Sequence, residues 1–186
     1  MSSWSVRGER GALTSDNGSY FQISGDSNQI VTRNNTYIRN PGYTSTTTTS
    51  ATYTHTIKPI SSNICQIRFD FETFQTEGPT TTGTPLGDCL IDTMTIREVR
   101  HLHSSSVVLV IKLKSFQGFD RTAAEIYKPP ILCGIGTGQH LYIDAHPYRE
   151  TSLDASLTLA LGAAGTSGRK WNIRVTQVKS LGRVFK

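Results

Sequence analysis

The sequence predicts an all-β protein, a sandwich of antiparallel strands, on three observations. Several short segments alternate apolar and polar residues with a period of two, as half-buried antiparallel strands do. Turn residues such as glycine, proline and asparagine separate these segments. The chain of 186 residues is 36% hydrophobic and only 18% charged, and it is rich in threonine, serine and glycine. That profile is typical of β-structure with polar turns, in one domain with or without tails.

The start of the chain, residues 1–33, is polar and is expected to be poorly ordered. Its apolar patch, Tyr20–Ile23, predicts an edge strand. Residues 40–42, Asn-Pro-Gly, predict a turn, because proline presets φ and glycine accepts a positive φ. The tract Thr44–Thr52 is of low complexity and predicts a loop, with O-glycosylation as the alternative interpretation.

Three strands are predicted in the first half of the chain, at Tyr53–Ile60, Ile64–Phe74 and Asp88–Ile96. The second of these shows the clearest alternation, with charged and amide side chains between the apolar ones. The side chains predicted to share the apolar faces are Tyr53, His55, Ile57, Ile67, Phe69, Phe71, Met94 and Ile96, with either Leu90 or Ile91.

The second half of the chain begins with a less regular region. There Val107–Ile111 is β-branched and apolar, which favours a buried strand, and Arg121–Tyr127 favours about two helical turns. A proline pair at residues 129–130 ends this region. The remaining predicted strands are Leu141–Asp144, Ser156–Leu161 and Lys170–Val178. In the last of these the side chains predicted to face the core are Trp171, Ile173 and Val175.

Charge and hydropathy narrow the classes of partner. The net charge is +5 and the pI is near 9.2, but the basic residues are scattered, so the charge is interpreted as a contribution to solubility. Aromatic residues lie on apolar strand faces rather than among basic residues, which argues against a nucleic-acid partner. The sequence has no apolar run of the roughly 18–20 residues that span a membrane. Met1–Arg10 has no apolar stretch of the kind found in signal peptides.

The motifs of this chain, taken together, resemble the CUB domain, and in particular its arthropod-type members. The resemblance rests on Asn-Thr-Tyr-Ile-Arg-Asn-Pro-Gly-Tyr at 35–43 and on Ile-Cys-Gln-Ile-Arg-Phe-Asp-Phe at 64–71. It continues with Gly-Asp-Cys-Leu-Ile-Asp at 87–92, Pro-Pro-Ile-Leu-Cys-Gly at 129–134 and Thr-Gly-Gln-His at 137–140. The closing strand, Trp-Asn-Ile-Arg-Val-Thr-Gln at 171–177, completes it.

The resemblance implies a jelly-roll-like β-sandwich, secretion, and extracellular recognition of a protein or a carbohydrate. It places the CUB-like domain at residues 34–179 and leaves residues 180–186 as a C-terminal tail. Arg97–Lys128 matches nothing in the family. We hypothesise that this segment is an insertion particular to the lineage or an error in the translated gene.

The cysteines follow the family pattern only in part. The resemblance implies a disulfide between Cys89 and Cys133 in a secreted protein, whereas both thiols would stay reduced in the cytosol. Closing so long a loop stabilises a fold by about 4 kcal/mol in the chain-entropy model. The family has a further cysteine where this chain has Tyr53, so Cys65 lacks its partner. We expect Cys65 to be an unpaired, buried and unreactive thiol.

Calcium is the cofactor that the resemblance suggests, because many CUB domains bind it through carboxylates between loops. Glu77 and Asp92 match two of the acidic positions of the family. The third position falls in the turn 162–165, which reads Gly-Ala-Ala-Gly and supplies no acid. The alternative is that Asp92 caps a turn or pairs with a tyrosine or a basic side chain. Tyr43 is a candidate for a binding loop at the same end of the domain.

No pattern argues convincingly for catalysis. The glycines at 134, 136 and 138 are spaced like a phosphate-binding loop but lack its lysine and its helix. His101 and His103 have no third metal ligand nearby in the sequence. A Cys133–His140 nucleophile is excluded if Cys133 forms a disulfide. The sequence therefore predicts a non-catalytic extracellular binding module, with a structural secreted or matrix protein without a small ligand as the alternative.

Overall fold

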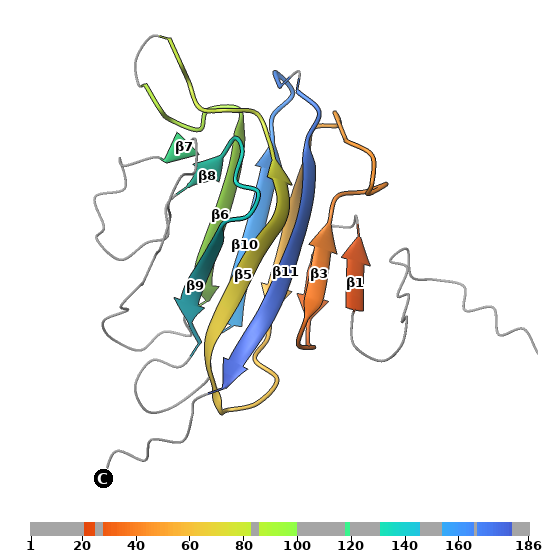
Figure 1. Ribbon diagram of the computed structural model, residues 1–186, viewed down its shortest axis with the longest axis vertical. Helices are drawn as coiled ribbons and strands as arrows, with labels where there is room; N and C mark the ends of the chain where they lie inside the picture. Colours follow the sequence, from red (N-terminus) through yellow and green to blue (C-terminus); the bar gives the residue numbers. More distant parts are fainter. Residues whose placement is uncertain are drawn as a thin grey trace, which may run out of the picture.

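The computed structural model describes residues 21–24, 28–82, 86–99, 118–119, 131–145, 154–165 and 167–179. Their regular structure consists of strands in two sheets (Figure 1), one in the order β1-β3-β11-β5-β9 and the other in the order β2-β4-β10-β6-β8-β7. The strands are β1 (Phe21–Ser24), β2 (Gln29–Val31), β3 (Thr36–Arg39), β4 (Ala51–Ile57), β5 (Ile64–Gln75), β6 (Asp92–Val99), β7 (Gly118–Phe119), β8 (Leu132–Cys133), β9 (His140–Asp144), β10 (Asp154–Leu161) and β11 (Lys170–Lys179). No helix in this part of the chain is long and apolar enough to cross a membrane.

The predicted all-β sandwich is confirmed, and its central strands are antiparallel. Two pairs at the sheet edges differ from the prediction, because β1 runs parallel to β3 and β2 runs parallel to β4. The first four strands alternate between the two sheets. Each parallel pair is therefore joined by a crossing through the opposite sheet and not by a hairpin, which would force the antiparallel direction.

The inner faces of the two sheets form a single apolar core. The alternation predicted for β10 and β5 is confirmed, with the apolar side chains of each strand buried and the polar ones facing outward. Trp171 of β11 is buried in this core, and its ring lies 5.3 Å from that of Tyr53 on β4. The side chains that the sequence placed in the core and the structure buries include Tyr53, His55, Ile57, Ile67, Phe69, Phe71, Met94, Ile96, Ile173 and Val175.

A β-bulge interrupts the alternation near the end of β5. The register of β5 against β11 shifts between Asn172 and Ile173, so that Glu72 is the extra residue on β5. Phe71 and Phe74 consequently both face the core, although they are three residues apart. The bulge also turns Glu72 and its neighbour Thr73 outward over Asn172.

Strand β6 differs from the prediction in where it begins and in what its first inward residue is. The segment predicted as a strand from Asp88 onward becomes regular only at Asp92. Leu90, which was a candidate for the core, is 62% exposed. The inward face reads Asp92, Met94 and Ile96, so a carboxylate occupies the first inward position of the strand.

Several predictions fall outside the described residues. These are the order of residues 1–20, the strand at Val107–Ile111, the helical turns at Arg121–Tyr127 and the tail at 180–186. Within residues 1–33 the structure places strands β1 and β2, and β1 includes most of the predicted edge strand. Of the segment Arg97–Lys128 it describes the end of β6 and the short strand β7, which pairs with β8.

The predicted disulfide and the predicted unpaired cysteine are confirmed, but the unpaired Cys65 is half-buried and not buried as expected. Cys89 and Cys133 form a disulfide that joins the loop before β6 to strand β8, with their Cα atoms 5.8 Å apart. Cys65 is a free thiol, half-buried at the start of β5, and its Sγ donates to the carbonyl oxygen of Val178 at 3.3 Å. The disulfide is consistent with an extracellular location, because such bonds persist in oxidising compartments.

The core also contains an ionisable side chain. His55 of β4 is 1% exposed, and its Nδ1 has no hydrogen-bond partner within the described part of the chain. Burial lowers the pKa of His55 from 6.5 to about 4, because the imidazolium form would be charged in an apolar environment. The unfolded chain therefore takes up a proton as the pH falls below 6.5, while the folded chain remains neutral at this residue down to about pH 4.

We predict that His55 makes the fold less stable in acid. Between pH 6.5 and pH 4, the free energy of unfolding should fall by about 3 kcal/mol through His55 alone. Urea titrations of the wild type and of His55→Leu across this pH range measure the effect as the difference between the two slopes. An identical pH dependence in the two proteins would show that His55 is not buried in a neutral form.

Candidate functional site at the loop end of the sandwich

Four loops gather at one end of the sandwich, at the top in Figure 1. They are residues 40–50 between β3 and β4, 76–91 between β5 and β6, 134–139 between β8 and β9, and 162–169 between β10 and β11. We call this end the loop end. Glu77, Asp92 and Tyr43, the residues singled out from the sequence, all lie in or next to these loops.

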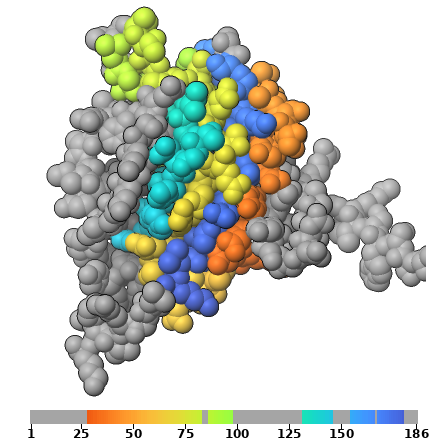
Figure 2. All heavy atoms as spheres, viewed as in Figure 1, coloured from red at the N-terminus to blue at the C-terminus, as the bar shows by residue number. Residues whose placement is uncertain are grey.

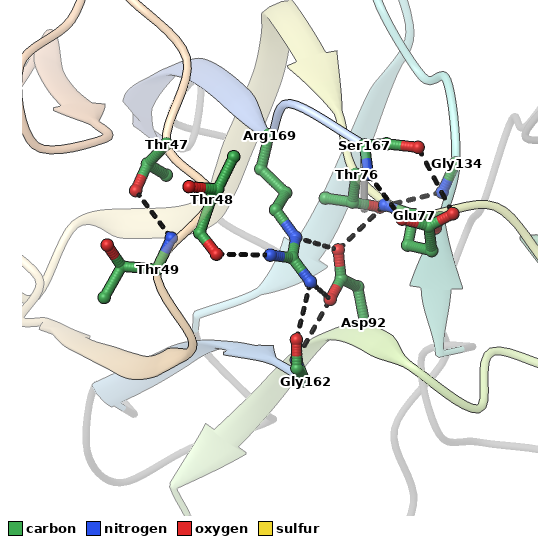
Figure 3. Close-up of polar contacts among 10 residues, drawn as sticks. All are labelled: Thr47, Thr48, Thr49, Thr76, Glu77, Asp92, Gly134, Gly162, Ser167 and Arg169. Carbon is green, nitrogen blue, oxygen red and sulfur yellow. Dashed lines mark hydrogen bonds and ion pairs between the residues drawn. The ribbon is translucent and has the colours of Figure 1, made fainter. Parts of the chain in front are cut away.

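A buried ion pair between Asp92 and Arg169 is the centre of the loop end (Figure 3). The Arg169 Nε donates to Asp92 Oδ2 and the Arg169 Nη2 donates to Asp92 Oδ1, both at 2.8 Å. Both side chains have an exposed fraction of 0%. The hydrogen bond to Asp92 raises the pKa of Arg169 against the effect of burial, so the guanidinium stays charged. This bidentate geometry is the strongest form of an arginine–carboxylate pair.

The Asp92 and Arg169 side chains also form hydrogen bonds with backbone groups of the surrounding loops. Asp92 also accepts from the backbone N–H of Glu77 at 2.8 Å and from that of Gly162 at 3.0 Å. Arg169 also donates to the carbonyl oxygens of Thr48 at 3.0 Å and Gly162 at 2.7 Å. The pair therefore ties three of the loops to the start of β6.

Glu77 lies beside this pair but bonds to a different group. Its carboxylate accepts from the backbone N–H of Ser167 at 3.0 Å and from the Ser167 hydroxyl at 3.2 Å. Its carbonyl oxygen accepts from the N–H of Gly134, next to the disulfide, at 3.0 Å. Gly165 packs directly on the Arg169 guanidinium, so that a Cβ at this position would overlap Nη2. Glycine at 165 thus makes room for the buried arginine.

The donor set at the loop end does not fit a calcium ion. Calcium needs about six to eight oxygen ligands, and both oxygens of Asp92 are already bonded to a guanidinium. Within the described residues no three carboxylate, histidine or cysteine side chains come together as a metal site would require. Of the interpretations that the sequence left open for Asp92, pairing with a basic side chain is the one that the structure shows.

We predict that calcium does not stabilise the protein, because the Arg169 guanidinium already provides the positive charge that pairs with Asp92. The midpoint of thermal unfolding should be the same in millimolar calcium and in excess chelator, within the error of the measurement. Calcium-dependent backbone shifts at Glu77 and Asp92, or a rise of several degrees in the midpoint with calcium, would contradict this expectation.

Tyr43 lies on the outer side of the same loops. The loop that carries it is fixed by Asn40, which is fully buried. The Asn40 side chain accepts from the Trp171 N–H at 3.0 Å and donates to the Ser45 carbonyl oxygen at 2.9 Å. Gly42 has a φ of 66°, as the predicted turn requires. Tyr43 is thereby held against the start of β11.

The outward side chains of β3, β11, β5 and β9 form what we call the polar face, at the front of the molecule in Figure 2. Charged and aromatic residues meet here across the strands. Arg68 and Arg174 both pair with Asp70, and Arg68 donates to the Tyr142 hydroxyl at 2.9 Å. The face also includes Tyr37, Arg39, Glu72, His140, Lys170 and Asn172.

Sequence reasoning missed Arg169, Arg39 and Lys170. The signal for Arg169 was present in the sequence, because Arg169 stands two residues before Trp171 and alternation places both on the same inward face. The same argument applies to Asp92, two residues before Met94. The pairing of Asp92 with Arg169 depends on how the two sheets pack against each other. The alternation of residues within one strand does not reveal that packing.

No protein-family model and no curated protein matches this sequence.

Proposed function

We propose that the protein is a non-catalytic binding module of the CUB type that works outside the cell and recognises a protein or a carbohydrate. The observation that carries this proposal is the polar face. A sheet face that only contacts solvent needs no more than scattered charged residues. On this face, tyrosine and arginine side chains contact one another. Such residues are enriched where proteins bind partners.

The extracellular part of the proposal is supported by the disulfide between Cys89 and Cys133. The same bond removes Cys133 as a nucleophile, so the Cys133–His140 hydrolase considered from the sequence has no thiol to attack with. The buried pair of Asp92 and Arg169 supports a structural role for the loop end, which holds the adjoining loops in one conformation.

The test is a binding screen with the oxidised protein. The protein is expressed behind an added signal sequence and applied to an array of glycans and to a panel of extracellular proteins. We expect a specific ligand whose affinity falls for the variant Arg68→Ser/Tyr142→Ser on the polar face. The matched control is Thr95→Ser/Thr158→Ser, whose residues face outward from β6 and β10 of the opposite sheet.

Two outcomes would overturn the proposal. Affinity that falls equally in the control would remove the polar face as the binding surface. Absence of any glycan or protein ligand, together with assembly of the protein into an insoluble matrix, would favour the structural protein that the sequence left as the alternative.

A further inference from the structure

Two cations on the polar face stand apart from its ion-pair network. Arg39 at the end of β3 and Lys170 at the start of β11 form no ion pair with a carboxylate within the described part of the chain. The Nε of Arg39 donates to Asn172 Oδ1 at 2.9 Å. The two terminal amino groups of this guanidinium and the ammonium of Lys170 have no hydrogen bond to another described residue, so they can donate to a ligand.

The ring of Tyr43 brings these two cations together. The guanidinium carbon of Arg39 lies 4.8 Å from the centre of the ring, and the Nζ of Lys170 lies 5.3 Å from it. The Tyr43 hydroxyl is 3.4 Å from the Thr73 hydroxyl, which holds the ring in place. Cation–π attraction to the ring partly offsets the repulsion between the two charges.

The arrangement is pre-organised. Arg39, Lys170 and Tyr43 are each half-buried, and the loop that carries the tyrosine is anchored by the buried Asn40. A ligand therefore meets two positive charges whose side chains are already largely immobilised, which reduces the entropic cost of binding. Two adjacent unpaired cations on a fixed platform are complementary to an anionic group with several oxygens.

The residues around Arg39 and Lys170 indicate which class of molecule carries the anionic group. Strands β3, β11 and β5 each have ladder partners on both sides, so the sheet offers no free backbone edge to a peptide at this point. Next to the two cations lie the exposed carboxylate of Glu72 and the half-buried hydroxyl of Thr73, while the buried amide of Asn172 holds Arg39 and Glu72 in place. These side chains suit a partner that presents hydroxyl groups next to its charge.

We propose that Arg39, Lys170 and Tyr43 form a subsite for the sulfate or carboxylate group of an acidic glycan. This inference rests on the proposed function and names the class of its ligand. The subsite recognises the anion through charge and hydrogen bonds, while Glu72 and Thr73 contact hydroxyl groups of the neighbouring sugar.

The experiment measures binding of the oxidised protein to heparin oligosaccharides, dextran sulfate, neutral dextran and poly-glutamate. We expect binding to the two sulfated glycans that weakens with added salt, and none to neutral dextran. The variant Arg39→Gln/Lys170→Gln should bind about tenfold more weakly, because it loses charge-assisted hydrogen bonds. Tyr43→Leu keeps both charges and should bind a few times more weakly, because the cations lose their platform.

The matched control is Lys58→Gln/Arg97→Gln, which removes the same net charge from two exposed side chains away from the polar face. An equal loss of affinity in this control would overturn the subsite in favour of attraction by net charge. Equal or tighter binding to poly-glutamate, lost in Arg39→Gln/Lys170→Gln, would make an acidic peptide the occupant and overturn the glycan. A ligand found in the array screen that is insensitive to all these variants would overturn the subsite and leave the proposed function standing.

Discussion

Replacing Arg169 with methionine is expected to lower the free energy of unfolding by about 3–5 kcal/mol. The variant leaves the Asp92 carboxylate in a site where its exposed fraction is 0%, with no counter-charge. It also removes the donors to the carbonyl oxygens of Thr48 and Gly162. Urea denaturation of the two proteins at neutral pH measures the difference.

A second substitution separates two contributions to this loss of stability, namely the uncompensated charge of Asp92 and the lost packing of the Arg169 side chain. In the Arg169→Met background, Asp92→Asn removes the uncompensated charge but keeps an oxygen that can accept from the N–H groups of Glu77 and Gly162. We expect the double variant to recover part of the lost stability, which is the sign of a coupled pair. Arg169→Lys keeps a positive charge without the bidentate geometry and should lie between the wild type and Arg169→Met.

The control for these variants is Arg97→Met, on the same strand as Asp92 but exposed. Its effect should stay within about 0.5 kcal/mol, as at most surface positions. A loss below about 1 kcal/mol for Arg169→Met would mean that water reaches the carboxylate and that the pair is not buried in solution.

Much of the sandwich could be predicted from the alternation of apolar and polar residues. The inward faces of β4, β5, β10 and β11 follow directly from it, because each strand is half-buried and lies in the interior of its sheet. The parallel edges were not predictable in this way. The direction of β1 and β2 depends on how the chain crosses between the sheets, which leaves no local pattern.

The sequence predicted individual residues of the candidate site but not how they pair with one another. The resemblance to CUB domains selected Glu77 and Asp92, and the structure places them next to each other at the loop end. The resemblance also suggested that calcium is the cation bound by these carboxylates, because Glu77 and Asp92 match acidic positions of the family. The actual partner is Arg169, which lies 77 residues away from Asp92 in the sequence.

The bulge at Glu72 is another feature that strand periodicity does not reveal. It places Glu72 and Thr73 together on the polar face, next to the platform formed by Tyr43. A strictly alternating strand would have turned one of these two side chains into the core. The composition of the polar face therefore depends on one irregular residue, and not on the average pattern of β5.

Removing the disulfide is the other change for which we expect a large effect. The variant Cys89→Ser/Cys133→Ser should lose about 4 kcal/mol, because the bond closes a loop with a sequence separation of 44 residues and restricts the unfolded chain. This is a large share of the roughly 5–15 kcal/mol that keeps a domain folded. Denaturant titrations of the wild type, with and without a reducing agent, should show the same difference as the variant.

Cys65→Ser provides the matched control, since it removes a half-buried thiol that forms no disulfide. It should change the stability by less than about 1 kcal/mol and should leave the response to the reducing agent intact. Next to Cys133, the Gly134 N–H donates to the Glu77 carbonyl oxygen at 3.0 Å and to the Thr76 hydroxyl at 2.8 Å. If reduction leaves the midpoint unchanged, the loop is held by those hydrogen bonds alone, and the protein could fold equally well in a reducing compartment. A loss of the expected size would instead make an oxidising environment a condition of its stability, as the extracellular proposal requires.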